Sequence, residues 1–388
     1  MPWKVICPMD ERWRLVHMFH TGKFTVAELA LRFGVSRKSV YKWISRFATE
    51  GEAGLRERSR APQHHPNATP DVVVQALLRA KRAHPTWGPA KLFPATRLSA
   101  DLAGQWPAIS TRGSILARHQ LTVPRHRRRH TPPWTQPFQA CDQPNAVWCA
   151  DFKGWFRTGD GQRCDPLTIT DAYSRFLLAC EIVPPDAEHA RLVFERVFQE
   201  YGVPMALHTD NGAPFASIGA AGLSALSVWW VKLGIRPERS RPGHPEENGR
   251  HERMHETLKA DTLRPPAETP PAQQRRFVGY REEFNTLRPH QALGQVPPAE
   301  VYTPSLRPYS PHPPDPSYAP DTQVRRVRSK GQIKWRGELV YLSEALIGEL
   351  VGIEEGEHAC SVSFGPITLG LLAPGKGGLT RLTRPPHA

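Results

Sequence analysis

The apolar pattern of the chain changes near residue 145, and this change constrains the fold more than any other feature. Before it, apolar residues recur at helical spacing in short segments. Beyond it, strand-like runs alternate with amphipathic helices, an order that is typical of an α/β layer fold. The expected strands are 147–152, 166–170, 176–183, 205–209 and 235–240, and the expected helices are 186–201, 222–233 and 246–262.

Residues 25–47 predict two helices joined by a tight turn. Thr25 and Glu28 have the spacing of a capping box, Gly34 suits the turn, and Ser36 can cap the second helix. The expected core between the helices consists of Leu29, Val35, Val40 and Ile44. This pattern resembles the helix-turn-helix of transposases and repressors, although an ordinary helical hairpin is the alternative.

The second helix of this pair carries the residues that a recognition helix would use. Arg37, Lys38 and Lys42 lie early on it, where such a helix meets the major groove of DNA. We therefore expect these three side chains to contact DNA, and we expect residues 1–60 to form a helix-turn-helix domain.

Residues 61–130 predict a second helical, helix-turn-helix-like domain that includes a basic linker. Its helices are expected near 70–83, 89–101 and 110–120, with Ser110 and Thr111 as candidate caps of the last one. A basic run follows and is expected to track DNA phosphates; its arginines are Arg125, Arg127, Arg128 and Arg129. A solvated linker is the alternative, and the two interpretations are compatible.

The distribution of charge supports a polyanionic partner for the N-terminal third. Residues 1–130 carry 23 Lys/Arg against 8 Asp/Glu, a net charge of +15, whereas residues 131–320 carry 19 against 22 and residues 321–388 carry 9 against 7. A basic region of this kind invites nucleic acid. Charge alone would also fit a merely soluble basic surface.

Other functional classes are disfavoured by composition. No apolar run approaches the roughly 18 residues that span a bilayer, and the N-terminus lacks an apolar signal region. The six cysteines form no closely spaced pair, which disfavours a zinc site and a disulfide framework. We therefore expect a cytoplasmic protein without a membrane partner, associated with the nucleoid when bound to DNA.

The C-terminal part predicts a further domain behind a proline-rich segment. Residues 297–320 hold nine prolines among 24 residues, which indicates a stiff spacer. Beyond it, short strand-like runs separated by glycines predict a small β-barrel domain over 321–388.

Three carboxylates lie at element ends of the α/β region. Asp151 is in the first expected strand, Asp210 ends the fourth, and Glu252 is on the last helix. Phosphoryl transfer on DNA develops charge on the entering and leaving oxygens, which two divalent ions about 3.5–4 Å apart can stabilise. Mg²⁺ prefers oxygen ligands, so one carboxylate shared by two ions, with one more on each side, is a suitable cage.

The flanks of these carboxylates carry a more specific signal. Residues 148–153, 208–212 and 241–255 resemble the retroviral-integrase-type core of bacterial insertion-sequence transposases. The resemblance is close over about 140–305. It implies an RNase H-like fold, an Asp-Asp-Glu triad at Asp151, Asp210 and Glu252, and two Mg²⁺ ions that Mn²⁺ can replace. It also implies cutting and joining of DNA at the ends of a mobile element.

Two features depart from that family. The interval from Asp210 to Glu252 is longer than in retroviral integrases, and the loop near 217–224 could absorb the extra residues. One turn beyond Glu252, where many relatives place a base, the chain has Glu256; Lys259, two turns on, could meet DNA instead.

The whole chain is therefore expected to be a multidomain transposase, with helix-turn-helix modules, an RNase H-like core and a small β-barrel. Its partners would be the terminal inverted repeats of its element, target DNA and at least one further copy of itself, because two ends must be held together. A DNA-binding regulator without catalysis and a nuclease of the RNase H class remain alternatives. Glu246 and Glu247 are the alternatives for the third carboxylate, but a place in the first helical turn explains both.

Overall fold

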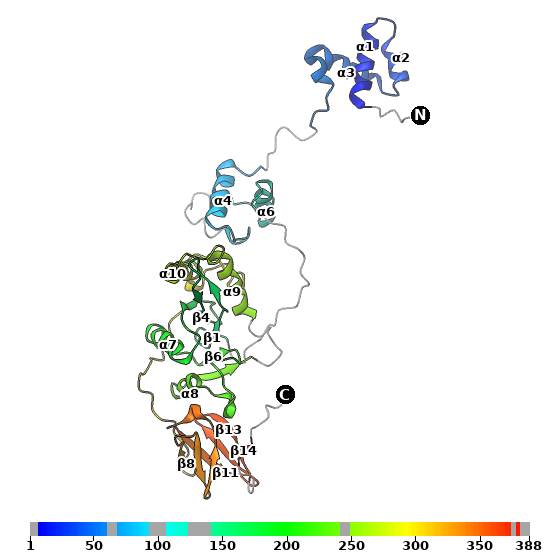
Figure 1. Ribbon diagram of the computed structural model, residues 1–388. Helices are drawn as coiled ribbons and strands as arrows, with labels where there is room; N and C mark the ends of the chain where they lie inside the picture. Colours follow the sequence, from blue (N-terminus) through cyan, green and yellow to red (C-terminus); the bar gives the residue numbers. More distant parts are fainter. Residues whose placement is uncertain are drawn as a thin grey trace. The chain divides into compact units, whose positions relative to one another are not determined.

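The computed structural model describes residues 7–59, 68–92, 106–122, 141–240, 249–373 and 378–380 (Figure 1). The chain divides into two compact units, Met1–Ala68 and Thr69–Ala388. No helix among the described residues is long and apolar enough to cross a membrane.

The first unit consists of helices α1 (Pro8–His20), α2 (Val26–Arg32) and α3 (Arg37–Glu50), followed by the 3₁₀ helix η1 (Gly51–Leu55). The expected caps are confirmed. The Thr25 hydroxyl accepts from the Glu28 amide while the Glu28 carboxylate accepts from the Thr25 amide, and the Ser36 hydroxyl accepts from the Ser39 amide. Gly34 has the positive φ that the turn requires.

The core of this unit differs from the prediction at one position. Leu29 and Val40 are fully buried and Ile44 packs against them, as expected, whereas 37% of Val35 is exposed. Val35 lies in the turn between Gly34 and the cap residue Ser36, so its side chain is outside the interface of the two helices. Leu15, Val16 and Trp43 are buried in the same cluster.

The second unit begins with helices α4 (Asp71–Ala83) and α6 (Ile109–Arg118). They pack through a small apolar cluster that comprises Leu77, Leu78, Trp87, Leu92, Ile115 and Leu116. The expected helix over 89–101 lies mostly outside the described residues. Ser110 and Thr111 are not caps: α6 begins at Ile109 after Ala108, so both residues are inside its first turn and no side chain caps it.

A mixed five-stranded sheet forms the centre of the second unit. Its order is β5-β4-β1-β6-β7, from β1 (Val147–Phe152), β4 (Pro166–Asp171), β5 (Leu177–Ile182), β6 (Ala206–Thr209) and β7 (Arg236–Arg239). β4 is antiparallel to β1 and β5, whereas β6 is parallel to β1 and β7. A small hairpin, β2 (Phe156–Arg157) and β3 (Arg163–Cys164), joins β1 to β4.

Helices cover both faces of this sheet (Figure 1). On one face, α7 (Ala187–Tyr201) and α8 (Ala225–Lys232) pack on residues such as Trp148 and Ile169, and Trp229 and Trp230 are buried there as core residues, as expected. On the other, α9 (Gly249–Thr262) and α10 (Pro270–Thr286) pack on Leu177 and Cys180. The expected strand and helix alternation is confirmed, with residues 241–248 of the last expected helix outside the described part.

The proline-rich segment is not a free spacer. Tyr302 stacks on Phe176, with 4.3 Å between ring centroids, and the Ser305 amide donates to the Tyr201 carbonyl at 2.8 Å. The guanidinium of Arg307 donates to the carbonyls of Leu233 and Gly234. The segment includes the 3₁₀ helix η6 (Pro298–Glu300), after η5 (Gln291–Leu293). The prolines stiffen the segment, but the aromatic and basic residues between them fasten it to the sheet domain.

The C-terminal part forms an open sheet. Its order is β14-β13-β12-β11-β8, from β8 (Gln323–Arg326), β11 (Leu350–Glu355), β12 (Cys360–Phe364), β13 (Ile367–Leu372) and β14 (Leu379–Thr380). A separate hairpin pairs β9 (Gln332–Trp335) with β10 (Glu338–Tyr341), and the 3₁₀ helix η7 spans Glu344–Leu346. The small β-barrel is therefore not confirmed, since the described strands form no closed barrel.

This C-terminal sheet shares a core with the central domain. Val228 and Val231 of α8, and Leu223 beside the 3₁₀ helix η3 (Ala220–Gly222), belong to the same buried cluster as Ile353 and Phe364. α8 therefore packs on the central sheet and on the C-terminal sheet, which explains why it is apolar on several sides.

Candidate active site

Asp151 is placed by the register of the central sheet. It lies near the end of β1 and is paired with Thr168 of β4. Side chains alternate between the faces of a strand, so the neighbour Ala150 joins the core under α7 and α8 while Asp151 faces α9. About 20% of its side chain is exposed.

Asp210 follows the adjacent parallel strand. β6 pairs with β1 through Cys149 and His208, so both strands run toward the same edge of the sheet. Asp210 directly follows β6, and one of its carboxylate oxygens accepts from the Gly212 amide at 3.2 Å. A Cβ atom at position 212 would lie 2.9 Å from the Asp210 carboxylate, so glycine leaves room for that carboxylate in the turn.

Glu252 is on the first turn of α9 and is exposed. The pKa of Asp151 is raised to about 7, chiefly by burial and to a smaller extent by the negative charges of Asp210 and Glu252. Within the described residues, no lysine or arginine forms an ion pair with any of these three carboxylates.

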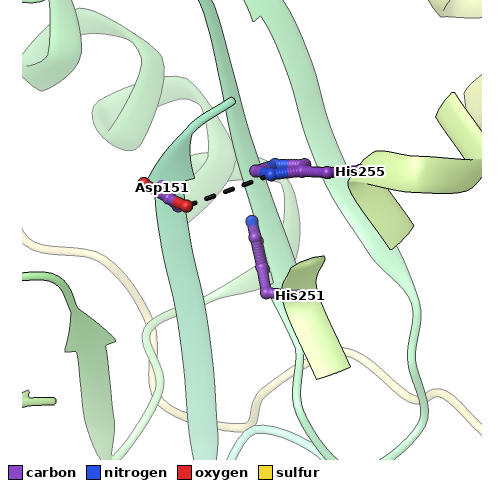
Figure 2. Close-up of side chains that lie close together, drawn as sticks. All are labelled: Asp151, His251 and His255. Carbon is purple, nitrogen blue, oxygen red and sulfur yellow. Dashed lines mark ion pairs between the residues drawn. The ribbon is translucent and has the colours of Figure 1, made fainter. Parts of the chain in front are cut away.

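Two histidines of α9 lie beside Asp151, and neither was predicted from the sequence to belong to the site. Figure 2 shows His251 and His255 directed from α9 toward Asp151. His255 Nδ1 is 3.9 Å from Asp151 Oδ2. Within the described part of the chain, Asp151, His251 and His255 form a group whose potential ligand atoms lie within 4.8 Å of one another. The sequence signal that could have revealed them is that His251 and His255 are four residues apart on one expected helix, and so lie on the same face.

Thr168 connects these groups. Its hydroxyl lies 2.7 Å from His251 Nε2 and 2.7 Å from His255 Nε2, and it donates to the Asp151 carbonyl at 3.1 Å. Because a hydroxyl has one hydrogen to donate, both Nε2 atoms must then donate to it. His251 Nδ1 accepts from the Thr170 hydroxyl at 3.0 Å, which leaves His255 Nδ1 as an unprotonated nitrogen beside Asp151.

Burial keeps both imidazoles neutral. It lowers the pKa of His251 to about 3 and that of His255 to about 2, with smaller contributions from neighbouring histidine and lysine charges. A neutral imidazole can offer a lone pair to a metal ion, whereas an imidazolium cannot. The site therefore presents carboxylate oxygens and one imidazole nitrogen at neutral pH.

Two lysines belong to the elements that carry the carboxylates. Lys153 is two residues beyond Asp151, and burial lowers its pKa, with a smaller contribution from the charge of Lys259 on α9. Lys259 is exposed, as its expected contact with DNA requires. Lys153 was not singled out by the sequence, although it is two residues from Asp151.

Of the other residues predicted to contact DNA, those on α3 are described by the structure and those of the basic run are not. Arg37, Lys38 and Lys42 are exposed on α3, and Tyr41 between them is 61% exposed. Glu246 and Glu247 lie outside the described residues, and so do the four arginines of the basic run, Arg125, Arg127, Arg128 and Arg129.

Asp171 is a structural residue, as expected. It is buried, and its carboxylate accepts hydrogen bonds from the amides of Asn145 and Ser174 and from the Ser174 hydroxyl. These bonds stabilise the turn between β4 and β5 and connect it to Asn145, which lies just before β1.

Comparison with known families tests the resemblance seen in the sequence. Two integrase core domain families match the central part, over residues 142–245 and 233–298. Together these two matches cover residues 142–298. A helix-turn-helix domain family matches residues 11–63, and a homeodomain-like domain family matches residues 39–116. The predicted combination of N-terminal helix-turn-helix domains with an integrase-type core is therefore confirmed.

Two curated relatives are proteins of bacterial insertion elements. The chain is 26% identical over 251 residues to the uncharacterized 39.2 kDa protein of insertion element IS476 from Xanthomonas euvesicatoria, covering 61% of the chain and 67% of the relative. It is 28% identical over 161 residues to the uncharacterized 31.7 kDa protein of insertion element IS407 from Burkholderia multivorans, covering 40% of the chain and 55% of the relative. The second match thus spans little more than half of that relative.

Among solved structures, the integrase catalytic core domain of HTLV-2 in complex with magnesium is similar to this chain. The identity is 14% and the TM-score 0.34, over 42% of the chain and 100% of the HTLV-2 domain.

Proposed function

We propose that this protein is the transposase of a bacterial insertion element: it binds the element ends and catalyses metal-dependent DNA cleavage and strand transfer. The observation that carries the proposal is the match of residues 142–298 to integrase core domain families, with Asp151 and Asp210 on adjacent parallel strands of that region. The charge of Glu252, together with that of Asp210, raises the pKa of Asp151, which supports the same assignment. The helix-turn-helix domains and the insertion-element relatives support the same function.

The chemistry of the donor set fits divalent metal ions. Three carboxylates that repel one another, without a basic partner among the described residues, are stabilised when cations lie between them. Asp151, Asp210 and Glu252 would together hold two Mg²⁺ ions; Mn²⁺ would substitute. Such ions supply charge stabilisation on the entering and leaving oxygens and a reactive oxygen nucleophile.

The protein's own groups would position the DNA around these carboxylates. Lys153, two residues from Asp151, and the exposed Lys259 of α9 would bind phosphates that flank the reacting one. Arg37, Lys38 and Lys42 on α3 would read the element end, and the arginines at 125, 127, 128 and 129 would bind its backbone. A covalent link between enzyme and DNA is not needed, because water and then the freed 3′-hydroxyl act as nucleophiles.

The organisation of the chain fits this division of labour. We assign residues 1–60 and 61–130 to DNA binding, 140–305 to catalysis and 321–388 to a small C-terminal β domain. Because two element ends must be joined to one target, the active form would contain at least two copies of the chain. It would act in the bacterial cytoplasm, on the nucleoid.

A comparison of two glutamates of α9 tests the proposal. Glu252→Gln should abolish nicking and joining of labelled element ends, because it removes a metal-binding charge, while end binding remains. Glu256→Gln is the matched control, since it makes the same substitution one turn further along the same exposed helix surface, and it should keep most activity. Full activity of Glu252→Gln would show that the third carboxylate has been assigned to the wrong residue.

A further inference from the structure

We propose that His255 is a ligand of the metal ion bound by Asp151, which makes this position a mixed oxygen and nitrogen site that prefers Mn²⁺ to Mg²⁺. The inference rests on the proposed metal-dependent function and adds to it one ligand and a metal preference. The three carboxylates alone would form an all-oxygen site.

The distance between the two groups fits a shared ion. His255 Nδ1 and Asp151 Oδ2 are 3.9 Å apart and face each other across the gap between α9 and β1 (Figure 2). Ligand bonds of about 2.0–2.2 Å from a nitrogen and an oxygen allow these atoms to be up to roughly 4.3 Å apart. No change of helix position is needed for one ion to contact both atoms.

The orientation of His255 is fixed by a second group, as it is in metal sites of proteins. A histidine ligand usually donates its other ring N–H to a fixed acceptor. Here His255 Nε2 lies 2.7 Å from the Thr168 hydroxyl, which in turn donates to the carbonyl of Asp151. The same threonine therefore holds the imidazole and the strand residue that would share the ion.

His251 differs from His255 although both belong to the same cluster. Both of its ring nitrogens already have partners, Nε2 with Thr168 at 2.7 Å and Nδ1 with Thr170 at 3.0 Å. It would have to break one of these buried hydrogen bonds to bind an ion. Among the residues that the structure describes, His255 Nδ1 has the Asp151 carboxylate at 3.9 Å beside it and no hydrogen bond that would compete with the ion. His251 therefore supports Thr168 and is not itself a ligand.

The nitrogen ligand has a consequence for metal preference. Mg²⁺ prefers oxygen ligands, whereas affinity for imidazole rises along the first transition series from Mn²⁺ onward. The ratio of Mn²⁺ affinity to Mg²⁺ affinity should therefore be larger for this site than for a site of carboxylates alone. In the His255→Gln variant, Mn²⁺ affinity should fall by about tenfold or more while Mg²⁺ affinity changes little.

Pulsed electron paramagnetic resonance of Mn²⁺ bound to the full chain tests the ligand directly. The wild-type spectrum should show modulation from a ¹⁴N nucleus bonded to the metal. Incorporation of [¹⁵N]histidine should convert that modulation to the ¹⁵N pattern, and this test needs no variant. His255→Gln should lose the modulation and keep bound Mn²⁺. His189→Gln, an exposed histidine of α7 that pairs with Asp186, is the matched control and should keep it.

The outcomes separate this inference from the proposed function. Mn²⁺ that is bound by the wild type and lost in Asp151→Asn, but shows no histidine nitrogen, would overturn the inference and leave the carboxylate site intact. Nitrogen modulation that persists in His255→Gln would overturn it as well, because another residue would then be the ligand. A wild-type chain that binds no Mn²⁺ would contradict both the inference and the metal-dependent function.

Discussion

Replacement of Asp151 by Asn should make the metal-free protein more stable at alkaline pH. Burial and two nearby negative charges make the ionised form of the Asp151 carboxylate unfavourable in the folded protein. The pKa of Asp151 is raised from an ordinary 3.8 to about 7. At about 1.36 kcal/mol for each pKa unit, the ionised form costs the folded state at most roughly 4 kcal/mol. Asparagine resembles the protonated acid and avoids this cost.

The sign follows from linkage between protonation and folding. An acid with a raised pKa in the folded state favours folding below its unfolded pKa, and that contribution is lost as the pH rises through the folded pKa. For Asp151 the loss falls between pH 4 and pH 7. In EDTA, wild type and Asp151→Asn should therefore unfold at similar temperatures near pH 4. At pH 8 the variant should be the more stable.

Calorimetry of the core transition in EDTA measures this difference. For a domain of this size, 1 kcal/mol corresponds to a shift in Tm of about 2–4 °C, so the maximum of roughly 4 kcal/mol corresponds to a Tm of the variant that is about 8–16 °C higher at pH 8. Addition of Mg²⁺ should raise the Tm of the wild type and leave that of Asp151→Asn almost unchanged. An Asn variant whose advantage does not grow with pH would refute the reasoning about this carboxylate.

Three further outcomes follow. Combined substitution of Arg37, Lys38 and Lys42 by Ala should weaken binding to element ends, and each lost phosphate contact should lower the salt slope by about one; unchanged end binding in a titration would remove α3 from the interface. Asp171→Ala should destabilise the core by roughly 3 kcal/mol, because it leaves buried donors of Asn145 and Ser174 without their acceptor; retained Mn²⁺ binding at low temperature would confirm that it is no ligand. Stripping with EDTA should stop cleavage, and Ca²⁺ should restore assembly of the DNA complex but not the reaction, which a gel-shift and cleavage comparison distinguishes.

The sequence was most informative where a local rule decides the structure. The capping box of Thr25 and the strand over residues 147–152 depend on neighbours in the chain, and both are found in the structure. The carboxylates at Asp151 and Asp210 could be placed because parallel strands end at one edge of a sheet. Glu252 needed the flanking motif, since periodicity alone does not orient a helix.

Predictions were less successful where tertiary contacts decide. Nothing local shows that His255 would lie opposite Thr168, because that contact depends on how α9 packs on the sheet. Prolines near 297–320 indicated a spacer, but Tyr302 and Arg307 bind the segment to the core. The C-terminal strands were expected, but whether they close depends on pairing between distant strands, and the described ones form an open sheet.

The most direct test of the central claim is a strand-transfer assay with the full chain, Mg²⁺, a labelled element end and a plasmid target. A transposase should give two products: ends with a freed 3′-hydroxyl, and those ends joined to the target. Cleaved ends without joined product would indicate a nuclease, and bound but uncut ends would indicate a DNA-binding regulator. Either result would contradict the assignment of this protein as a transposase.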